Sequence, residues 1–508
     1  MYTYFDLKEF LKDSDMRLIM VADAETRVHE RKNDKLTIKI PAGGVSVALD
    51  PIMKAAGGIY IGRGRTEADK EVVDSKNRYK VEAPDGEYTL KRVFAPKDEE
   101  DAYYYGFANQ TLWPLCHVAF EAPEFHDEWF RGYKAVNERF AKAIKEELTG
   151  NKKTLLWIHD YQMMLVPSMV KGYNKNTAIG MFWHIPWPTW EVFRILPQKK
   201  EILESMLACD FIAFHRGYQA SNFIETVERE LEVRIDRERS RIHYKDHATT
   251  VTHLPLGIDN DVIRSLLVDR TEQGIVGKFV QSIIGTPKVE EDPFEEFFKS
   301  HKVIVGVDRL DYTKGLVLRL RAIDRFLEQN PQYIGKVVYV GIVAPSREPI
   351  PSYAHLKKQL KEKAQELNKK YVQENGWMPI FLLHEVFNRH NIMQFYQRAN
   401  LCLVTPRDDG MNLVSKEFVL ASSRSSNPGM LVLSQFAGSA MDLTEALIVN
   451  PYDTNEVAKA IKKGPEMDKK EKIERTASMV KTLDERNLYQ WAESFLKGTL
   501  SSVALPRK

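Results

Sequence analysis

The sequence predicts an α/β protein with two parallel-sheet domains. Short apolar runs recur along the chain, each run ends in polar residues, and amphipathic helical segments separate the runs. Buried strands that alternate with helices in this way are typical of parallel sheets covered on both faces. The chain has 508 residues. Because a single hydrophobic core stops growing at about 250–300 residues, two domains are expected.

The predicted strands fall into two groups along the chain. The first group comprises the apolar runs at 154–160, 178–188 and 208–215. The second comprises those at 301–311, 335–347, 378–386, 399–410, 429–439 and 446–453. Residues 271–300, between the groups, are charged and lack a clear period. We therefore expect a first domain at 1–270, a second domain at 271–485, and a final helix at 486–508 that packs back on the first domain.

The charge balance and the cysteines narrow the class of protein. The net charge is +2 and the pI is about 8.1, which argues against a chain that wraps nucleic acid or lies on an anionic membrane. The three cysteines are far apart and form no C-x-x-C pair, so neither a disulfide framework nor a structural zinc site is expected. The N-terminus lacks the apolar core of a signal peptide, and no run approaches about 18 apolar residues, so we expect a cytoplasmic chain.

The segment GVDRLDYTKG at 306–315 carries the strongest local signal. A predicted strand ends there, and Arg309 and Lys314 follow, five residues apart. Arginine offers a planar fork for phosphate oxygens and lysine adds a compact charge. The two cations could neutralise the diphosphate of a nucleotide sugar. The spacing equally allows each cation to pair with a neighbouring acid, such as Asp308 or Asp311.

The segment TPRDDGMNLVSKEF at 405–418 combines the end of a strand with the start of a helix. The helix is expected to begin near Met411, where its free N–H groups favour an anion. Glu417 lies about two turns into this helix and can accept hydrogen bonds from a ribose diol. Asp408 and Asp409 are adjacent, so their side chains point in different directions, and no matching cluster of histidine or aspartate accompanies them. Metal binding is therefore the weaker interpretation.

Polar and aromatic residues of the first half add to this picture. His159 and His184 each follow a strand-like run, and the pair, with Asp160 beside one of them, favours a site over a purely structural role. The aromatic stretch at 103–117 serves either as packing or as a wall for a sugar ring.

Two loop features could serve the same ligands. Arg347 lies in a loop bracketed by prolines after another predicted strand. Gly43 and Gly44 precede a predicted helix, where glycines allow the backbone to approach a phosphate closely. Each signal is weak alone. Together they indicate groups suited to phosphates and a sugar.

In their order along the chain, these segments resemble the trehalose-6-phosphate synthase family of retaining glycosyltransferases, family 20. The match covers nearly the whole chain, and RLDYTKG and DGMNLVSKE are highly specific in combination. Further matching stretches are AGGVSVALDPIMKAAGG, FANQTLWP, WIHDYQ, HIPWPTWEVFRILP, LPLGID and APSR. The resemblance implies a GT-B fold, with two Rossmann-like domains facing across a cleft. It also implies glucosyl transfer without metal or other cofactor, from a nucleotide sugar (UDP-glucose first) to glucose 6-phosphate.

The resemblance also implies roles for individual residues. Arg309 and Lys314 would hold the donor diphosphate, which the backbone of Gly44 approaches. His184 and Asp409 would contact the transferred glucose. The remaining donor residues would be Gly410, Met411, Asn412 and Leu413, with Glu417 on the ribose. The acceptor positions would be Tyr104, Trp113, Asp160 and Arg347.

Two departures from the family pattern fall on the acceptor side. The family's N-terminal SNR turn, whose arginine holds the acceptor phosphate, is replaced by LIMVADAETRVHE, where Arg27 is the nearest substitute. The family's WFGW is replaced by YIGRGR. We hypothesise that Arg63 or Arg65 binds the acceptor phosphate. A solvent-exposed basic turn is the alternative.

Other functions stay open. The chain could use another phosphorylated acceptor, such as glycerol 3-phosphate, or it could be a non-catalytic homologue that binds sugar phosphates. A fused phosphatase is disfavoured because no D-x-D-x-[TV] signature occurs. The expected partners are a nucleotide sugar and a sugar phosphate, not nucleic acid or a membrane. The donor base (UDP, ADP or GDP) and a homo-oligomeric state are left open.

Overall fold

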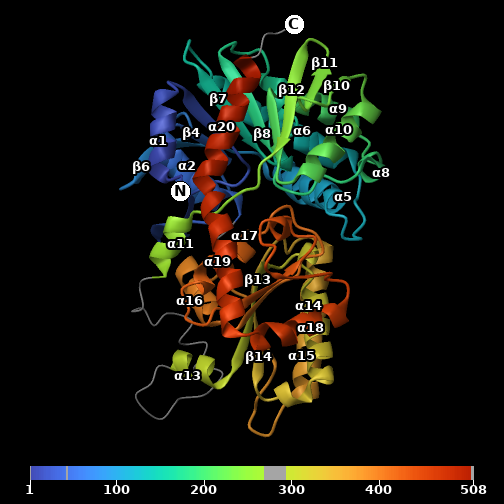
Figure 1. The fold of residues 1–508 in the computed structure, drawn as a ribbon. Helices are drawn as coiled ribbons and strands as arrows, with labels where there is room; N and C mark the ends of the chain where they lie inside the picture. Colours follow the sequence, from blue (N-terminus) through green and yellow to red (C-terminus); the bar gives the residue numbers. More distant parts are fainter. Residues whose placement is uncertain (1, 42–43, 268–292, 505–508) are drawn as a thin grey trace. The chain divides into compact units, whose positions relative to one another are not determined.

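The computed structural model describes residues 2–41, 44–267 and 293–504, which form two compact units (Figure 1). Unit 1 comprises Met1–Leu256 with Asn487–Lys508, and unit 2 comprises Gly257–Arg486. Each unit is built on its own large sheet of mainly parallel strands. The predicted α/β class with two Rossmann-like sheets is confirmed. The predicted boundary between residues 270 and 271 lies outside the described residues.

The sheet of unit 1 has ten strands in the order β10-β11-β12-β9-β8-β7-β1-β4-β6-β5. The strands from β12 to β6 run parallel, and antiparallel partners complete both edges. Fully buried runs such as TLLWIH form its centre, as expected for strands covered on both faces. The strands are β1 (Arg17–Val21), β4 (Ile59–Arg63), β5 (Arg78–Ala83), β6 (Gly86–Val93), β7 (Thr154–His159), β8 (Thr177–Phe182), β9 (Phe211–Phe214), β10 (Arg234–Asp236), β11 (Arg241–Tyr244) and β12 (His247–His253). A separate hairpin pairs β2 (Val28–Lys32) with β3 (Lys35–Lys39).

The final helix of the chain, α20 (Leu488–Ala504), belongs to unit 1 and packs on α1, α2 and strands β7 to β9 (Figure 1). Gly498 permits this close approach, because a Cβ there would lie 2.5 Å from the ring of Phe211. The other helices of unit 1 are α1 (Tyr4–Asp13), α2 (Val45–Ala56), α3 (Glu67–Glu71), α4 (Lys97–Glu100), the π-helix η1 (Asp101–Leu112), α5 (Trp113–Cys116), α6 (Asp127–Glu147), η2 (Tyr161–Met163), α7 (Val166–Val170), α8 (Trp190–Phe193), α9 (Lys199–Met206) and α10 (Gly217–Glu230).

The sheet of unit 2 has six parallel strands in the order β15-β14-β13-β16-β17-β18. They are β13 (Lys302–Arg309), β14 (Val337–Ala344), β15 (Ile380–Leu383), β16 (Leu401–Val404), β17 (Met430–Ser434) and β18 (Leu447–Val449). Parallel order places the carboxyl ends of neighbouring strands at one edge of the sheet. The polar residues after β13 therefore lie near those after β16.

Helices lie on both sides of the unit 2 sheet, with α14, α15 and α18 on one side and α16 and α17 on the other (Figure 1). The helices are α11 (Asn260–Leu266), α13 (Pro293–Ser300), η3 (Tyr312–Lys314), α14 (Leu316–Gln329), η4 (Pro331–Tyr333), α15 (Pro351–Tyr371), α16 (Arg389–Arg398), α17 (Leu413–Ser422), η5 (Gly438–Met441), α18 (Thr454–Glu466) and α19 (Lys469–Glu485). None of the helices within the described ranges is long and apolar enough to cross a membrane.

Candidate functional site

The structure brings Lys314 and Asp409 together at the carboxyl edge of the unit 2 sheet. Lys314 closes the short helix η3 after β13, and Asp409 follows β16, the strand that pairs with β13. The Nζ of Lys314 donates to Oδ2 of Asp409 at 2.5 Å, and the Nδ2 of Asn412 donates to the same oxygen at 3.0 Å. Three residues predicted for the donor thus form one hydrogen-bonded group.

Gly315 makes this juxtaposition sterically feasible. Its φ of +65° lies in the left-handed region that favours glycine, and it links η3 directly to α14. A Cβ at this position would collide with the carbonyl oxygen of Thr405, just after β16. The absence of a side chain therefore lets the turn that carries Lys314 lie against the end of β16.

Arg309 and Arg347 share the buried carboxylate of Asp311. The Nη1 of Arg347 donates to Oδ2 of Asp311 at 3.3 Å, and a guanidinium nitrogen of Arg309 lies 3.9 Å from the same oxygen. Burial alone would raise the pKa of Asp311, but the charges of Arg347, Arg309 and Lys314 outweigh it and hold that pKa below its ordinary value. Arg347 is buried, also donates to the Tyr353 hydroxyl at 2.7 Å, and so lies beside the donor cations within unit 2.

A buried arginine that sequence reasoning missed, Arg319, supports the same edge. Its Nη1 donates to Asp308 at 2.6 Å, and its Nε donates to the Thr405 hydroxyl at 3.0 Å. Asp308 is thus committed to Arg319. A signal was present in the sequence, because Arg319 occupies the i+3 position of a stripe whose other members are Leu316, Leu320 and Ile323.

The loop from Gly410 to Leu413 is fixed by the loop after β17. Ser439 donates its main-chain N–H to the carbonyl oxygen of Met411 at 2.7 Å. Asn412 caps α17 by accepting from the N–H of Ser415 at 3.0 Å, and its φ of +75° turns the chain into the helix. The helix therefore begins at Leu413, two residues later than predicted, with its N-terminus close to Asp409.

Glu417 lies in α17 and pairs with Arg389, the first residue of α16. The Nη2 of Arg389 donates to Oε1 of Glu417 at 2.7 Å, and both side chains are partly exposed. Arg389 is the second residue that sequence reasoning missed. It lies 28 positions before Glu417, and no spacing in the sequence connects the two.

His159, Asp160 and His184 come together in unit 1, at the ends of the paired strands β7 and β8. The Nδ1 of His159 lies 3.0 Å from Nε2 of His184, and the main-chain N–H of His184 donates to Oδ1 of Asp160 at 3.0 Å. Burial lowers the pKa of His184 to about 3 and lowers that of His159 well below its ordinary value. Both rings are therefore neutral near pH 7.

The aromatic stretch folds into η1 and α5 and contributes both to packing and to the surroundings of Arg63. Trp113 is buried, with ring centroids 4.1 Å from His117 and 5.7 Å from Tyr161. The guanidinium carbon of Arg63 lies 4.8 Å from the centroid of the Tyr104 ring. The stretch thus holds both predicted acceptor-side aromatics on one continuous helical segment.

The two arginines of YIGRGR converge on Asp23, just after β1. Arg63 donates to both carboxylate oxygens of Asp23, at 2.7 and 3.2 Å, and also to Glu100. Arg65 donates to Asp23 at 3.3 Å. The side chain of Arg63 is 4% exposed and that of Arg65 is 37% exposed, so Arg65 is the more accessible cation. Arg27, the nearest substitute for the family's arginine, pairs with Asp50 instead.

Gly44 is the N-cap of α2, and its φ of +77° lies in the region that favours glycine. Its neighbour Gly43 lies outside the described residues.

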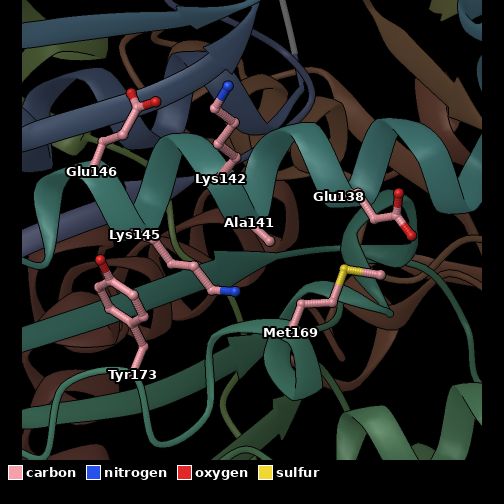
Figure 2. A pocket seen from close by; sticks show the side chains of 7 residues that line it. All are labelled: Glu138, Ala141, Lys142, Lys145, Glu146, Met169 and Tyr173. Atoms are coloured by element: carbon pink, nitrogen blue, oxygen red, sulfur yellow. The ribbon is translucent and has the colours of Figure 1, made fainter.

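A surface pocket of about 510 Å³ on α6 and α7, lined by Lys142, Lys145 and Tyr173 among others, contains none of the predicted site residues (Figure 2). Within the described ranges, no group of three or more metal-ligating side chains gathers.

Comparison with known proteins identifies the family. The model of glycosyltransferase family 20 matches residues 16–500. The chain belongs to glycosyltransferase family 20. The trehalose-6-phosphate synthase of Enterobacter sp. is 32% identical over 483 residues, covering 95% of this chain and 94% of that protein. A bifunctional trehalose-6-phosphate synthase/phosphatase of Thermoproteus tenax is 32% identical over 499 residues, and the match covers 96% of this chain but 64% of that longer protein.

Solved structures of this glycosyltransferase family share the fold. An E. coli structure described as bound with UDP-2-fluoro glucose has a TM-score of 0.81 and 31% identity, covering 95% of this chain and 98% of that chain. A UDP-forming alpha,alpha-trehalose-phosphate synthase from Burkholderia xenovorans in complex with glucose-6-phosphate has a TM-score of 0.82 and 28% identity, covering 95% of this chain and 100% of that chain.

Proposed function

We propose that this family 20 glycosyltransferase transfers glucose from UDP-glucose to glucose 6-phosphate, with retention of configuration, and forms trehalose 6-phosphate and UDP. The observation that carries the proposal is the cationic cluster of Arg309, Lys314 and Arg347 at the carboxyl edge of the unit 2 sheet. The relatives named above are trehalose-6-phosphate synthases, and solved structures hold a UDP-sugar and glucose 6-phosphate.

On the donor side, Arg309 and Lys314 would neutralise the diphosphate as it leaves, so that protein cations rather than a metal stabilise the developing charge. Glu417 would bind the ribose, and the backbone from Gly410 to Leu413 would bind sugar and phosphate. Asp409 and His184 would contact the transferred glucose, and the backbone of Gly44 would approach the diphosphate. The acceptor hydroxyl would attack from the face that the diphosphate leaves, and a departing phosphate oxygen would take its proton.

On the acceptor side, Tyr104, Trp113, Asp160 and Arg347 would position glucose 6-phosphate. Arg63 is committed to Asp23 and Glu100, so we assign the acceptor phosphate to Arg65 and a supporting role to Arg63. Arg65 keeps guanidinium N–H groups for a phosphate beyond its one contact with Asp23. The positive charge needed for a phosphate would then come from a different strand end than in the family pattern.

A second candidate keeps the donor and changes the acceptor. It is favoured by the carboxylate of Asp23, which stands between Arg63 and Arg65 near the place where the family carries an arginine. A smaller acceptor with its phosphate in a different place, such as glycerol 3-phosphate, could suit this arrangement.

The deciding experiment measures UDP release from UDP-glucose with glucose 6-phosphate, glycerol 3-phosphate and free glucose in parallel. We expect the highest kcat/KM with glucose 6-phosphate. Preference for glycerol 3-phosphate would establish the second candidate. The absence of turnover with any phosphorylated acceptor would overturn both transferase proposals. The absence of turnover with all three acceptors would favour a non-catalytic sugar-phosphate-binding protein.

A further inference from the structure

The buried ring of His159 contacts His184 and has no role in the reaction proposed above. His159 ends β7 and has no exposed surface, whereas His184, beyond the end of β8, is 8% exposed. The two strands are paired in parallel, and this pairing sets the rings side by side. His184 therefore keeps a small exposed surface, whereas His159 has none.

Most of the surroundings of the pair are aromatic rings, and a third histidine, His215, has its ring centroid 5.4 Å from that of His184. The ring centroid of His159 lies 4.9 Å from that of Trp157, and the ring of His184 lies 4.7 Å from Phe182. Trp491, on α20, lies 6.5 and 6.3 Å from the two histidines, and Figure 1 shows α20 crossing beside β7 and β8. Among the described residues, no hydrogen-bond partner lies within reach of Nε2 of His159.

This geometry restricts the placement of protons. Two neutral imidazoles joined by one hydrogen bond need one donor and one acceptor, and the contact joins Nδ1 of His159 to Nε2 of His184 at 3.0 Å. If His184 were the donor, the proton of His159 would sit on Nε2 and leave a buried N–H without an acceptor, an arrangement that folded proteins rarely contain. If His159 is the donor, that N–H is satisfied.

We propose that His159 is a positioning residue that fixes the ring and the tautomer of His184. Its Nδ1–H donates to Nε2 of His184, so the proton of His184 sits on Nδ1. His184 then offers an N–H donor, which suits an oxygen acceptor such as a sugar hydroxyl. The main-chain N–H of His184, held by Asp160, fixes the backbone from which this ring projects. The link to a sugar rests on the proposed function, whereas the tautomer does not.

The tautomer is tested directly by NMR on the full chain labelled with ¹⁵N-histidine. The chemical shifts of the ring nitrogens distinguish Nδ1–H from Nε2–H, and the variants His159→Asn and His184→Gln assign the signals. We expect Nδ1–H for both rings. An Nε2–H proton on either ring would overturn the proposal, whether or not the protein turns over UDP-glucose.

The functional consequence is tested by replacing His159. The amide nitrogen of asparagine mimics Nδ1 and can still donate, whereas phenylalanine keeps the ring and loses the donor. We expect His159→Phe to lower kcat about tenfold, the factor for one hydrogen bond, with little change in the donor KM, and His159→Asn to restore most of the loss. His243→Asn, on strand β11 beside the edge strand β10, is the control and should leave the rate unchanged.

Equal losses of kcat in His159→Phe and His159→Asn would contradict the positioning role, provided that thermal unfolding shows both variants to be folded. A wild-type chain that shows no transferase activity would instead contradict the proposed function and leave the NMR result to decide the tautomer.

Discussion

The Nζ of Lys314 lies 2.5 Å from Oδ2 of Asp409, and this hydrogen bond joins the carboxyl ends of the neighbouring strands β13 and β16. In the proposed reaction the lysine holds the donor diphosphate and the aspartate holds the donor glucose. An ammonium group has three N–H donors, so Lys314 can keep Asp409 and still bind phosphate. We therefore expect the two residues to act as a unit.

This coupling predicts non-additive losses of activity. Lys314→Met and Asp409→Asn should each lower kcat by about 10²–10³, the effect of removing one preorganised charge contact, and the double variant should lose little more than the worse single variant. Initial rates of UDP release by the wild type, the two single variants and the double variant complete this double-mutant cycle. Lys363→Met removes another lysine paired with an aspartate, Asp324, in unit 2, and should have no effect on the rate. Losses that multiply in the double variant would show that the two residues act independently.

The ion pair of Arg389 with Glu417 predicts an effect on donor binding. Arg389→Ala should leave Glu417 without its 2.7 Å partner and raise the KM for UDP-glucose about threefold to tenfold, with kcat nearly unchanged, because an ion pair on a partly exposed surface contributes about 1 kcal/mol. Glu417→Gln should raise the same KM at least as much. A fall in kcat at constant KM in either variant would place these residues at the reacting centre instead of the ribose.

The two arginines of YIGRGR should separate into a stability role and a binding role. Arg63→Ala breaks a buried pair with Asp23 and should lower the free energy of unfolding of unit 1 by about 3–5 kcal/mol. Arg65→Ala, at a more exposed position, should change stability by less than about 1 kcal/mol and raise the KM for glucose 6-phosphate. Chemical unfolding and acceptor kinetics measure the two effects. An unchanged acceptor KM in Arg65→Ala would favour the solvent-exposed basic turn.

A matched pair of glycines tests the turn that carries Lys314. Gly315→Ala adds a Cβ that collides with the carbonyl oxygen of Thr405, on top of the cost of about 1 kcal/mol for a left-handed residue. Gly335→Ala carries the same backbone cost at φ +82°, but its Cβ would meet no atom within 4 Å. Calorimetric unfolding should show a clearly larger loss for Gly315→Ala, together with a loss of activity that Gly335→Ala does not share. Equal losses would mean that the turn relaxes without displacing Lys314.

The buried histidines predict how stability depends on pH. The pKa of His184 is about 3 in the folded chain and about 6.5 when the chain is unfolded. Between these values the unfolded chain binds more protons, so the free energy of unfolding falls as pH drops below about 6.5 and is constant above it. The pKa of His159 is also lowered in the folded chain, so His159 changes the free energy of unfolding in the same direction.

Lowering the pH from 7.0 to 5.5 should reduce the free energy of unfolding by about 1 kcal/mol for each of the two histidines. Thermal unfolding of the wild type and of the variant His159→Asn/His184→Gln at both pH values isolates this contribution. A variant as sensitive to pH as the wild type would show that other groups dominate the pH dependence.

Much of unit 2 could be predicted from the sequence, because apolar runs that end in polar residues identify parallel strands and the edge where their carboxyl ends meet. Lys314 and Asp409 were expected at that edge, and they are in contact there. The ion pair of Arg63 with Asp23 was not predicted. It depends on β1 lying next to β4 in the sheet, and strand order is a consequence of tertiary packing that no local pattern records.

Arg389 and Glu417 show the same limit, since their contact depends on the packing of α16 against α17. Arg319 is different, because its place in an apolar stripe was readable in the sequence. A charged residue on the buried face of a helix predicts a buried partner, which in this chain is Asp308.

Proton NMR of the product tests the central claim most directly. The wild-type chain, supplied with UDP-glucose and glucose 6-phosphate, should release UDP and form a phosphorylated disaccharide with an α,α-1,1 linkage. Release of UDP without a disaccharide, or a disaccharide with a β linkage from the donor glucose, would contradict retaining transfer to glucose 6-phosphate.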